Sequence, residues 1–238
     1  MFRGRLGGGS MVLATVLLGV ALIATATPAQ AVTFNLTSCH VTAASGTGTD
    51  CGTQTVFGTV TLTQNGVNVD FDVELAGGNR FVQTGSADLQ LFKFNATGVV
   101  ATDIVSAATK NPLNAVGGGL QGSAGAFNGD GTGDFGFGIN CVTSANCKGG
   151  STPTFTGLTF TVDNASIADF LTANNSGNLF VADVLIASAN NGLGLTGPVD
   201  ATPGSVVPEP TTLLMVGTVL VGLGAAWRRR RSQRALAI

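Results

Sequence analysis

The stretch VFGTVTLTQNGVNVDFDVEL, from Val56 to Leu75, carries the clearest pattern of local structure in the sequence. Asn65-Gly66 in its middle is a strong signal for a type I′ turn, in which both central residues take a positive φ. Placing the turn there gives the expected cross-strand pairs Leu62 with Val69, Val60 with Phe71, Gly58 with Val73 and Val56 with Leu75. All of these pairs fall on one face, and the polar residues fall on the other. Turn and alternation therefore agree, and they predict an antiparallel hairpin with one buried face.

Several segments after the hairpin have strand-like patterns and are separated by turn residues. They are Ala87–Asn95, Thr97–Val105, Asp134–Cys141, Thr154–Val162 and Asn178–Ala187. SIADFLTANN predicts one short helix, with Asn164 or Ser166 as its N-cap and Gly177 near its end. Residues 106 to 133 are Gly-rich and weakly patterned, which favours a surface loop. Because the chain also has 35 glycines, we expect an all-β fold, an antiparallel β-sandwich of jelly-roll or Greek-key type.

The N-terminus has the layout of a secretory signal peptide. Arg3 and Arg5 supply positive charge, the apolar run from Met11 to Ala24 follows, and Ala29-Gln30-Ala31 matches an A-x-A cleavage site. We therefore expect residues 1–31 to be removed on export, so that the mature chain begins at Val32. The alternative is an uncleaved N-terminal membrane anchor.

The four cysteines fall into two local pairs, and an even number of cysteines in an exported protein favours disulfides. We expect Cys39–Cys51 and Cys141–Cys147, which is one of the three connectivities that four cysteines allow. A metal site is the alternative, but only His40 stands near these cysteines as a further ligand. No cofactor is expected.

The charge of the exported part argues against one class of partner. Between residues 32 and 207 the chain has four basic residues and twelve acidic ones, a net charge of −8. Phosphate recognition draws on Lys and Arg, so a nucleic-acid partner is not expected.

An uncharged apolar segment of 17 residues runs from Thr211 to Trp227. As a helix it is about 25 Å long, enough for the core of a bilayer. Four arginines follow it directly: Arg228, Arg229, Arg230 and Arg231. A basic flank of this kind stays in the cytoplasm, so the arginines set the orientation of a transmembrane helix. The triplet before the segment is Pro208, Glu209 and Pro210, whose prolines favour an extended and accessible chain.

The triplet, the glycine-containing apolar segment and the arginine cluster together resemble a PEP-CTERM sorting signal over residues 206 to 231. Such signals occur in exported proteins of Gram-negative bacteria that often produce exopolysaccharide. The resemblance implies that an exosortase, a membrane enzyme with a Cys nucleophile, recognises the triplet and removes the tail. The expected organisation is a signal peptide at 1–31, an exported β-sandwich domain at 32–205, the sorting signal at 206–231 and a cytoplasmic tail at 232–238.

Candidate catalytic residues are few. The sequence has one histidine, His40, and a Cys–His nucleophilic pair with Cys39 would need Cys39 to be free of a disulfide. Asp70, Asp72 and Glu74 alternate along one strand, and glycoside hydrolysis needs two carboxylates that flank a sugar. The simpler interpretation of these acids is the solvated face of the hairpin. We expect no enzymatic activity.

The stretch FNGDGTGDFGFG, from Phe127 to Gly138, is a candidate calcium loop, because Asn128, Asp130 and Asp134 would supply oxygen ligands. An EF-hand loop that starts at Asn128 would need a glutamate where Ile139 stands, so that motif fails. A turn between two strands is the alternative interpretation.

These observations favour an exported, non-catalytic component of the cell surface or extracellular matrix that is held briefly in the inner membrane and then processed. Association with exopolysaccharide is part of this hypothesis. A carbohydrate- or calcium-binding surface module is the second hypothesis. A domain that stays permanently anchored by its tail is the third.

Overall fold

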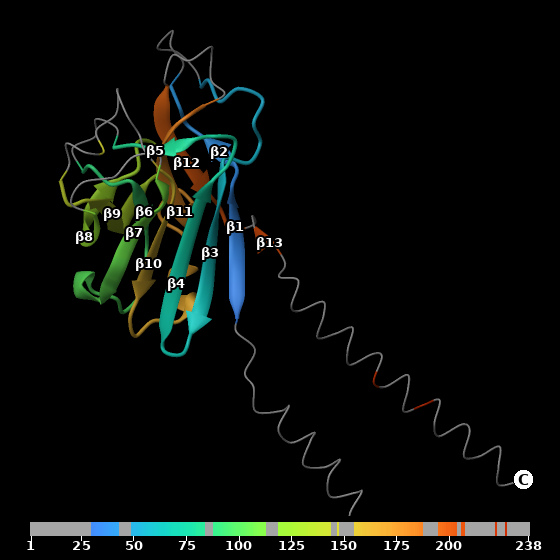
Figure 1. Ribbon diagram of the computed structural model, residues 1–238, viewed down its shortest axis with the longest axis vertical. Helices are drawn as coiled ribbons and strands as arrows, with labels where there is room; N and C mark the ends of the chain where they lie inside the picture. The colour runs from blue at the N-terminus through green and yellow to red at the C-terminus, as the bar shows by residue number, and fades with distance from the viewer. Residues whose placement is uncertain are drawn as a thin grey trace, which may run out of the picture. The chain divides into compact units, whose positions relative to one another are not determined.

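The computed structural model describes residues 30–42, 49–83, 88–112, 119–143, 147, 155–187, 195–203, 206–207, 222 and 227 (Figure 1). The chain divides into two units, Met1–Gln30 and Ala31–Ile238. Only Gln30 of the first unit is described, so the fold below is that of the second unit.

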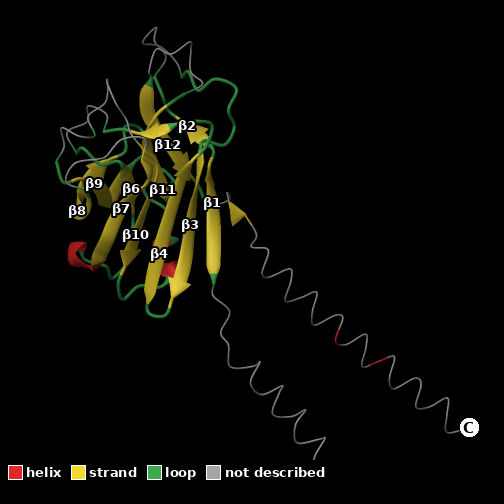
Figure 2. Cartoon of the chain, viewed as in Figure 1, coloured by secondary structure: helices red, strands yellow, loops and turns green. Residues whose placement is uncertain are grey.

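The fold consists of two antiparallel sheets. The six-stranded sheet has the order β13 (Val206–Val207), β1 (Ala31–Leu36), β3 (Gly58–Asn65), β4 (Asn68–Leu75), β10 (Phe155–Val162) and β7 (Ile104–Pro112). The seven-stranded sheet has the order β2 (Ser38–Cys39), β12 (Thr196–Ala201), β11 (Phe180–Leu185), β6 (Phe92–Phe94), β9 (Asp134–Cys141) and β8 (Leu120–Asn128), and β5 (Arg80–Phe81) also pairs with β11. The chain changes sheet after every one or two strands, as Greek-key sandwiches do. Figure 2 shows how strands dominate the described part of the chain, and the predicted all-β sandwich is confirmed.

The hairpin of β3 and β4 has the predicted faces but a different register. Leu62 pairs with Phe71 and Asn65 pairs with Asn68, so the two turn residues are Gly66 and Val67. Gly66 has a φ of 63°, which suits the first central position of a type II′ turn, where glycine is favoured. The register therefore differs by two residues from the predicted one. A shift of two residues returns every side chain to the same face, which explains why the apolar residues still point into the core.

Aromatic rings from both sheets meet at Phe71 on β4. Its ring stacks on that of Phe160 with centroids 4.3 Å apart, and it meets the ring of Phe170 edge-on at 4.9 Å. Phe94 and Phe180 of the other sheet lie within 5.4 and 6.2 Å of it. Each such pair contributes about 0.5–1.5 kcal/mol beyond the burial of its area. This cluster closes the middle of the sandwich.

The predicted helix is a single 3-10 turn, η3 (Ile167–Phe170), and does not extend to Gly177. Ser166 precedes it as the N-cap, and the carboxylate of Asp169 accepts hydrogen bonds from the N–H and the hydroxyl of Ser166, each 2.8 Å long. Both Ile167 and Phe170 are buried, and the N–H of Ile167 donates a hydrogen bond of 3.0 Å to Oε1 of Gln64 on the hairpin.

Two predicted segment assignments are wrong, and a third strand is shorter than predicted. The segment Thr97–Val105 is a loop followed by a 3-10 turn, η1 (Ala101–Asp103), before β7 begins. Residues 106 to 133 are not one surface loop, because they contain most of β7 and all of β8. The strand predicted at Ala87–Asn95 is confined to β6. The strands β7 and β8 each end a sheet and many of their small residues are exposed, so neither shows the apolar alternation of a half-buried strand.

Candidate functional site

The predicted sorting segment lies largely outside the described residues. Of the triplet, the apolar segment and the arginine cluster, only Gly222 and Trp227 are described, and both are helical and exposed. Within the described ranges, no helix is long and apolar enough to cross a membrane. The predicted signal peptide also lies outside them up to Ala29, whereas Ala31 and Val32 are the first residues of β1.

The chain just before the triplet is held by the fold. Val206 and Val207 form β13, which pairs with Phe34 and Thr33 at the edge of the six-stranded sheet. Antiparallel pairing fixes the backbone here in an extended form, which is the conformation that the residue before a proline prefers. The last described strand therefore ends at Val207, the residue before the triplet in the sequence.

The two predicted disulfides are present, Cys39–Cys51 and Cys141–Cys147, each with its Cα atoms 6.3 Å apart. The first joins β2 to the chain that leads into β3, and the second joins the end of β9 to the following loop. Because Cys39 is bonded to Cys51, it supplies no thiolate for a Cys–His pair.

His40 instead contacts an acid. Its Nε2 atom lies 2.7 Å from Oδ2 of Asp200, which is buried on β12, while His40 itself is 40% exposed. The other oxygen of Asp200 is buried without a hydrogen-bond partner among the described residues. The two residues are 160 positions apart in the sequence, so no local pattern predicts that they are in contact.

The acids of the hairpin lie on its outer face and have partners there. Nζ of Lys110 on β7 lies 2.7 and 2.8 Å from the two carboxylate oxygens of Asp72, and it also pairs with Glu74. Burial lowers the pKa of Lys110, but the hydrogen bonds to Asp72 and Glu74 outweigh it and leave this pKa raised. Asp70 accepts a hydrogen bond of 2.7 Å from Thr161. These contacts match the interpretation of a polar outer face of the sheet.

The candidate calcium loop forms the turn between β8 and β9. The side-chain oxygen of Asn128 accepts a hydrogen bond of 2.8 Å from the N–H of Asp130, which makes a local turn. The carboxylate of Asp134 accepts a hydrogen bond of 3.2 Å from Asn175. The side chains of Asn128 and Asp134, two of the three candidate Ca²⁺ ligands, therefore have protein partners. Among the described residues no group of three His, Cys, Asp or Glu side chains is arranged to hold a metal.

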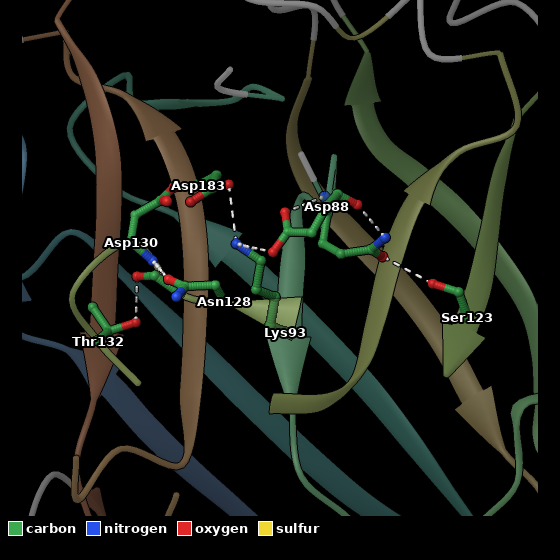
Figure 3. A network of polar contacts seen from close by, with 9 residues as sticks. Asp88, Lys93, Ser123, Asn128, Asp130, Thr132 and Asp183 are labelled. Carbon is green, nitrogen blue, oxygen red and sulfur yellow. Dashed lines mark hydrogen bonds and ion pairs between the residues drawn. The ribbon is translucent and has the colours of Figure 1, made fainter. Parts of the chain in front are cut away.

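A buried charged cluster lies on the outer face of the seven-stranded sheet, opposite the aromatic core. Lys93 stands between Phe92 and Phe94 on β6, so its side chain points away from the core, yet only 1% of it is exposed. Its Nζ atom lies 3.3 Å from Oδ2 of Asp183 on β11 and 3.5 Å from Oδ2 of Asp88. Figure 3 shows the amine between the two carboxylates. Asp183 is 1% exposed and Asp88 is 11% exposed.

The chain around Gln90 helps to cover this cluster. The buried amide of Gln90 donates a hydrogen bond of 2.7 Å to the carbonyl of Asp88 and accepts one of 2.9 Å from Ser123 on β8. Gly138 on β9 makes room for it, because a Cβ atom there would stand 2.7 Å from Cγ of Gln90. The segment that bears Asp88 is thereby fixed over the sheet.

Burial changes the titration of Asp183. Removal from water raises the pKa of its carboxyl to about 7, although the charge of Lys93 opposes the rise, and the nearby acids Asp130 and Asp88 add to it. The cluster therefore holds an amine next to a carboxyl group that takes up a proton easily. The sequence gives little sign of it, since a lysine between two phenylalanines is the expected pattern of a strand with one solvated face.

Comparison with known protein families gives one match. The model described as the PEP-CTERM protein-sorting motif matches residues 206–231, the span singled out from the sequence. No curated protein and no solved structure matches the chain. The matched span begins with β13, so its first two residues belong to the folded domain. The chain therefore carries a PEP-CTERM protein-sorting motif at residues 206–231.

Proposed function

We propose that this protein is an exported, non-catalytic component of the cell surface or extracellular matrix, processed by an exosortase at Pro208-Glu209-Pro210. The match at residues 206–231 carries the proposal, because this motif implies processing by an exosortase. In this proposal the apolar segment from Thr211 to Trp227 holds the protein in the inner membrane until it is cut. The arginines from 228 to 231 remain in the cytoplasm.

The way the domain ends supports this role. The pairing of Val206 and Val207 with β1 leaves no spacer between the last strand and the triplet. An enzyme in the membrane then meets the triplet next to a folded body, which limits the reach of the cut to a short stretch of chain. The two disulfides support an existence outside the cytoplasm, where such bonds persist.

The proposed association with exopolysaccharide rests on the resemblance of the motif to signals from bacteria that make such polymers. Its test is sedimentation of the mature protein with the polymer extracted from the same host. Recovery in the pellet only when the polymer is present supports the association. Recovery of the protein in the supernatant both with and without the polymer would contradict the association with exopolysaccharide. It would not affect the proposed processing by an exosortase.

The processing itself is tested by the intact mass of the protein from its native host, with and without the exosortase gene. In the parent strain we expect the mass of a chain that begins at Val32 and ends within the triplet. In the deletion strain we expect the mass of a chain that retains the tail. A tail that persists in both strains would show a permanently anchored domain and would overturn the proposal.

A variant sharpens this experiment. Replacing Pro208, Glu209 and Pro210 together by alanine is expected to leave the tail attached in the parent strain. The matched control is Pro203→Ala, which removes an exposed proline upstream of the motif and leaves the triplet intact. Normal processing of the triple variant would show that the triplet is not what the enzyme recognises.

A further inference from the structure

We propose that Lys93 and Asp183 join through an intramolecular amide bond that links β6 to β11, with Asp88 as the group that transfers protons between them. The proposal concerns the folded domain alone and does not depend on the sorting motif. It starts from the position of three side chains that meet on the covered face of the seven-stranded sheet (Figure 3).

The two reacting residues are held by neighbouring antiparallel strands. Lys93 pairs directly with Val181, so Asp183 is its diagonal neighbour on the same face. Diagonal neighbours of this kind are within reach of a long side chain. Nζ of Lys93 is 3.3 Å from Oδ2 of Asp183, which brings the nitrogen beside the carboxyl group with which it would react. The strands fix this arrangement, since Phe92 and Ala182 are themselves paired and buried in the core.

Burial opposes the presence of two charges at this position. Each side chain is 1% exposed, and an ammonium and a carboxylate removed from water carry a large desolvation cost. The reaction begins with transfer of one proton from Nζ of Lys93 to Asp183, and the raised pKa of Asp183 favours the protonated form of that acid. A neutral amine has the free electron pair that an attack on a carboxyl carbon needs.

The reaction requires no reagent from outside. The electron pair of Nζ forms a bond to Cγ of the protonated Asp183 carboxyl group, and Asp88 accepts a proton from the nitrogen. Asp88 then returns that proton to a hydroxyl of the tetrahedral carbon, the C–O bond breaks, and water leaves. One amine and one carboxylic acid become one amide and one water, and nothing is oxidised or reduced. The product replaces a buried amine and a buried acid by a neutral amide.

Asp88 is suited to the transfer of protons. Its Oδ2 is buried and lies 3.5 Å from Nζ of Lys93, which places a carboxylate oxygen beside the reacting nitrogen. The hydrogen bonds of Gln90 to the Asp88 carbonyl and to Ser123 hold its segment in place. An ordinary buried ion pair is the competing description of the same three residues, and it predicts no change in covalent mass.

The test is a peptide map of the protein purified from its native host, with both disulfides reduced. The expected protein is lighter than its sequence by one water. Trypsin is expected not to cut after Lys93, and one branched peptide should contain Lys93 and Asp183. A linear peptide cut normally after Lys93 in the folded protein would overturn the proposal. The branched peptide also excludes loss of water at Asp130-Gly131, which would leave a linear product.

Two variants complete the experiment. Asp88→Asn keeps both reacting residues and is expected to lower the fraction of branched peptide at least tenfold. Asp72→Asn is the matched control, because it removes an acid that pairs with the half-buried Lys110 in the other sheet, and the branched peptide is expected at its normal level. Equal branching in the Asp88 variant, with unchanged circular dichroism, would overturn the role given to Asp88. Equal loss in both variants would overturn the specificity of the site.

Discussion

The imidazole of His40 and the buried carboxylate of Asp200 lie 2.7 Å apart, although the first stands beside a disulfide on β2 and the second on β12. Strands β2 and β12 are neighbours, so this contact helps to fix a two-residue strand at the end of its sheet. Oδ1 of Asp200 lacks a described hydrogen-bond partner, which makes the contact with His40 the more important for that carboxylate.

His40→Ala is therefore expected to lower the free energy of unfolding by about 1–3 kcal/mol, because it leaves a buried carboxylate without its partner. Chemical denaturation at pH 7 measures the change. His40→Gln is the control, since its side-chain amide still donates a hydrogen bond, and it is expected to restore part of the loss. Equal stability of the alanine variant and the wild type would show that the pair contributes nothing.

Removal of Lys93 is expected to make stability depend more strongly on pH. Asp183 has a pKa of about 7 in the folded protein against 3.8 in its ordinary state, and the charge of Lys93 keeps it from rising further. An acid that binds more protons when folded makes the free energy of unfolding fall as the pH rises between these two values. In Lys93→Met the opposing charge of Lys93 is lost while the acids Asp88 and Asp130 remain, so the fall should extend above pH 7.

The measurement compares the free energy of unfolding of Lys93→Met with that of the wild type at pH 5 and pH 9. The destabilisation is expected to be larger at pH 9, where Asp183 must ionise without the charge of Lys93 beside it. The same result is expected whether or not Lys93 is joined to Asp183 in the wild type. An amide carries no charge, and an unjoined Lys93 offsets the charge of Asp183. Lys110→Met, which disturbs a pair that is partly open to solvent, should change little at either pH. A pH-independent difference would contradict the expectation.

Gly138 and Gly136 offer a matched pair of substitutions on the outer face of β9. Gly138→Ala places a Cβ atom 2.7 Å from Cγ of the buried Gln90, and we expect a loss of about 1–3 kcal/mol from overpacking. Gly136→Ala meets only Oδ1 of Asn95, at 3.5 Å, and should be tolerated. Thermal unfolding of both variants tests the contrast. Similar melting temperatures of the two variants would show that the Gln90 side chain can move to accommodate the added methyl group at little cost in stability.

Phe71→Ala removes the ring at the centre of the aromatic cluster and is expected to cost about 3–5 kcal/mol, as other large-to-small core substitutions do. Val67→Ala in the turn of the same hairpin is the control, since Val67 is 71% exposed and should be nearly neutral. Denaturant titration of the two variants gives the comparison. A cost below that of the control would show that the cluster does not define the core.

The sequence was most informative where a pattern depends on neighbouring residues. Alternation in the hairpin and in the segments near 134–141 and 155–162 predicted strands and their buried faces, because period two is a local property. It did not set the register of the hairpin, since a shift of two residues leaves the faces unchanged and the choice of turn decides. The end strands β7 and β8 were missed because an exposed strand of Ala, Ser and Gly has no apolar period.

Contacts between distant parts of the chain could not be predicted in the same way. Lys93 is 90 positions from Asp183, and each alone is an ordinary outward-facing residue on a strand. Asp88, in the segment before β6, contacts Lys93 on this face of the sheet. No local sequence pattern predicts that contact. The sorting motif is the opposite case, because its residues are consecutive and its recognition from sequence agrees with the family match.

The pairing of β13 with β1 also sets how the domain responds to mechanical load. A pull on the C-terminal end reaches β13 first, and in the described part of the chain β13 pairs with β1 through Val206 and Val207. The strand that precedes it in the chain, β12, belongs to the other sheet, where it pairs with β11 over six residues and also has β2 as a neighbour. β13 can therefore peel away and release a short length of chain while the sandwich stays intact. A protein held at a surface by this end would have a small elastic reserve before its core bears any force.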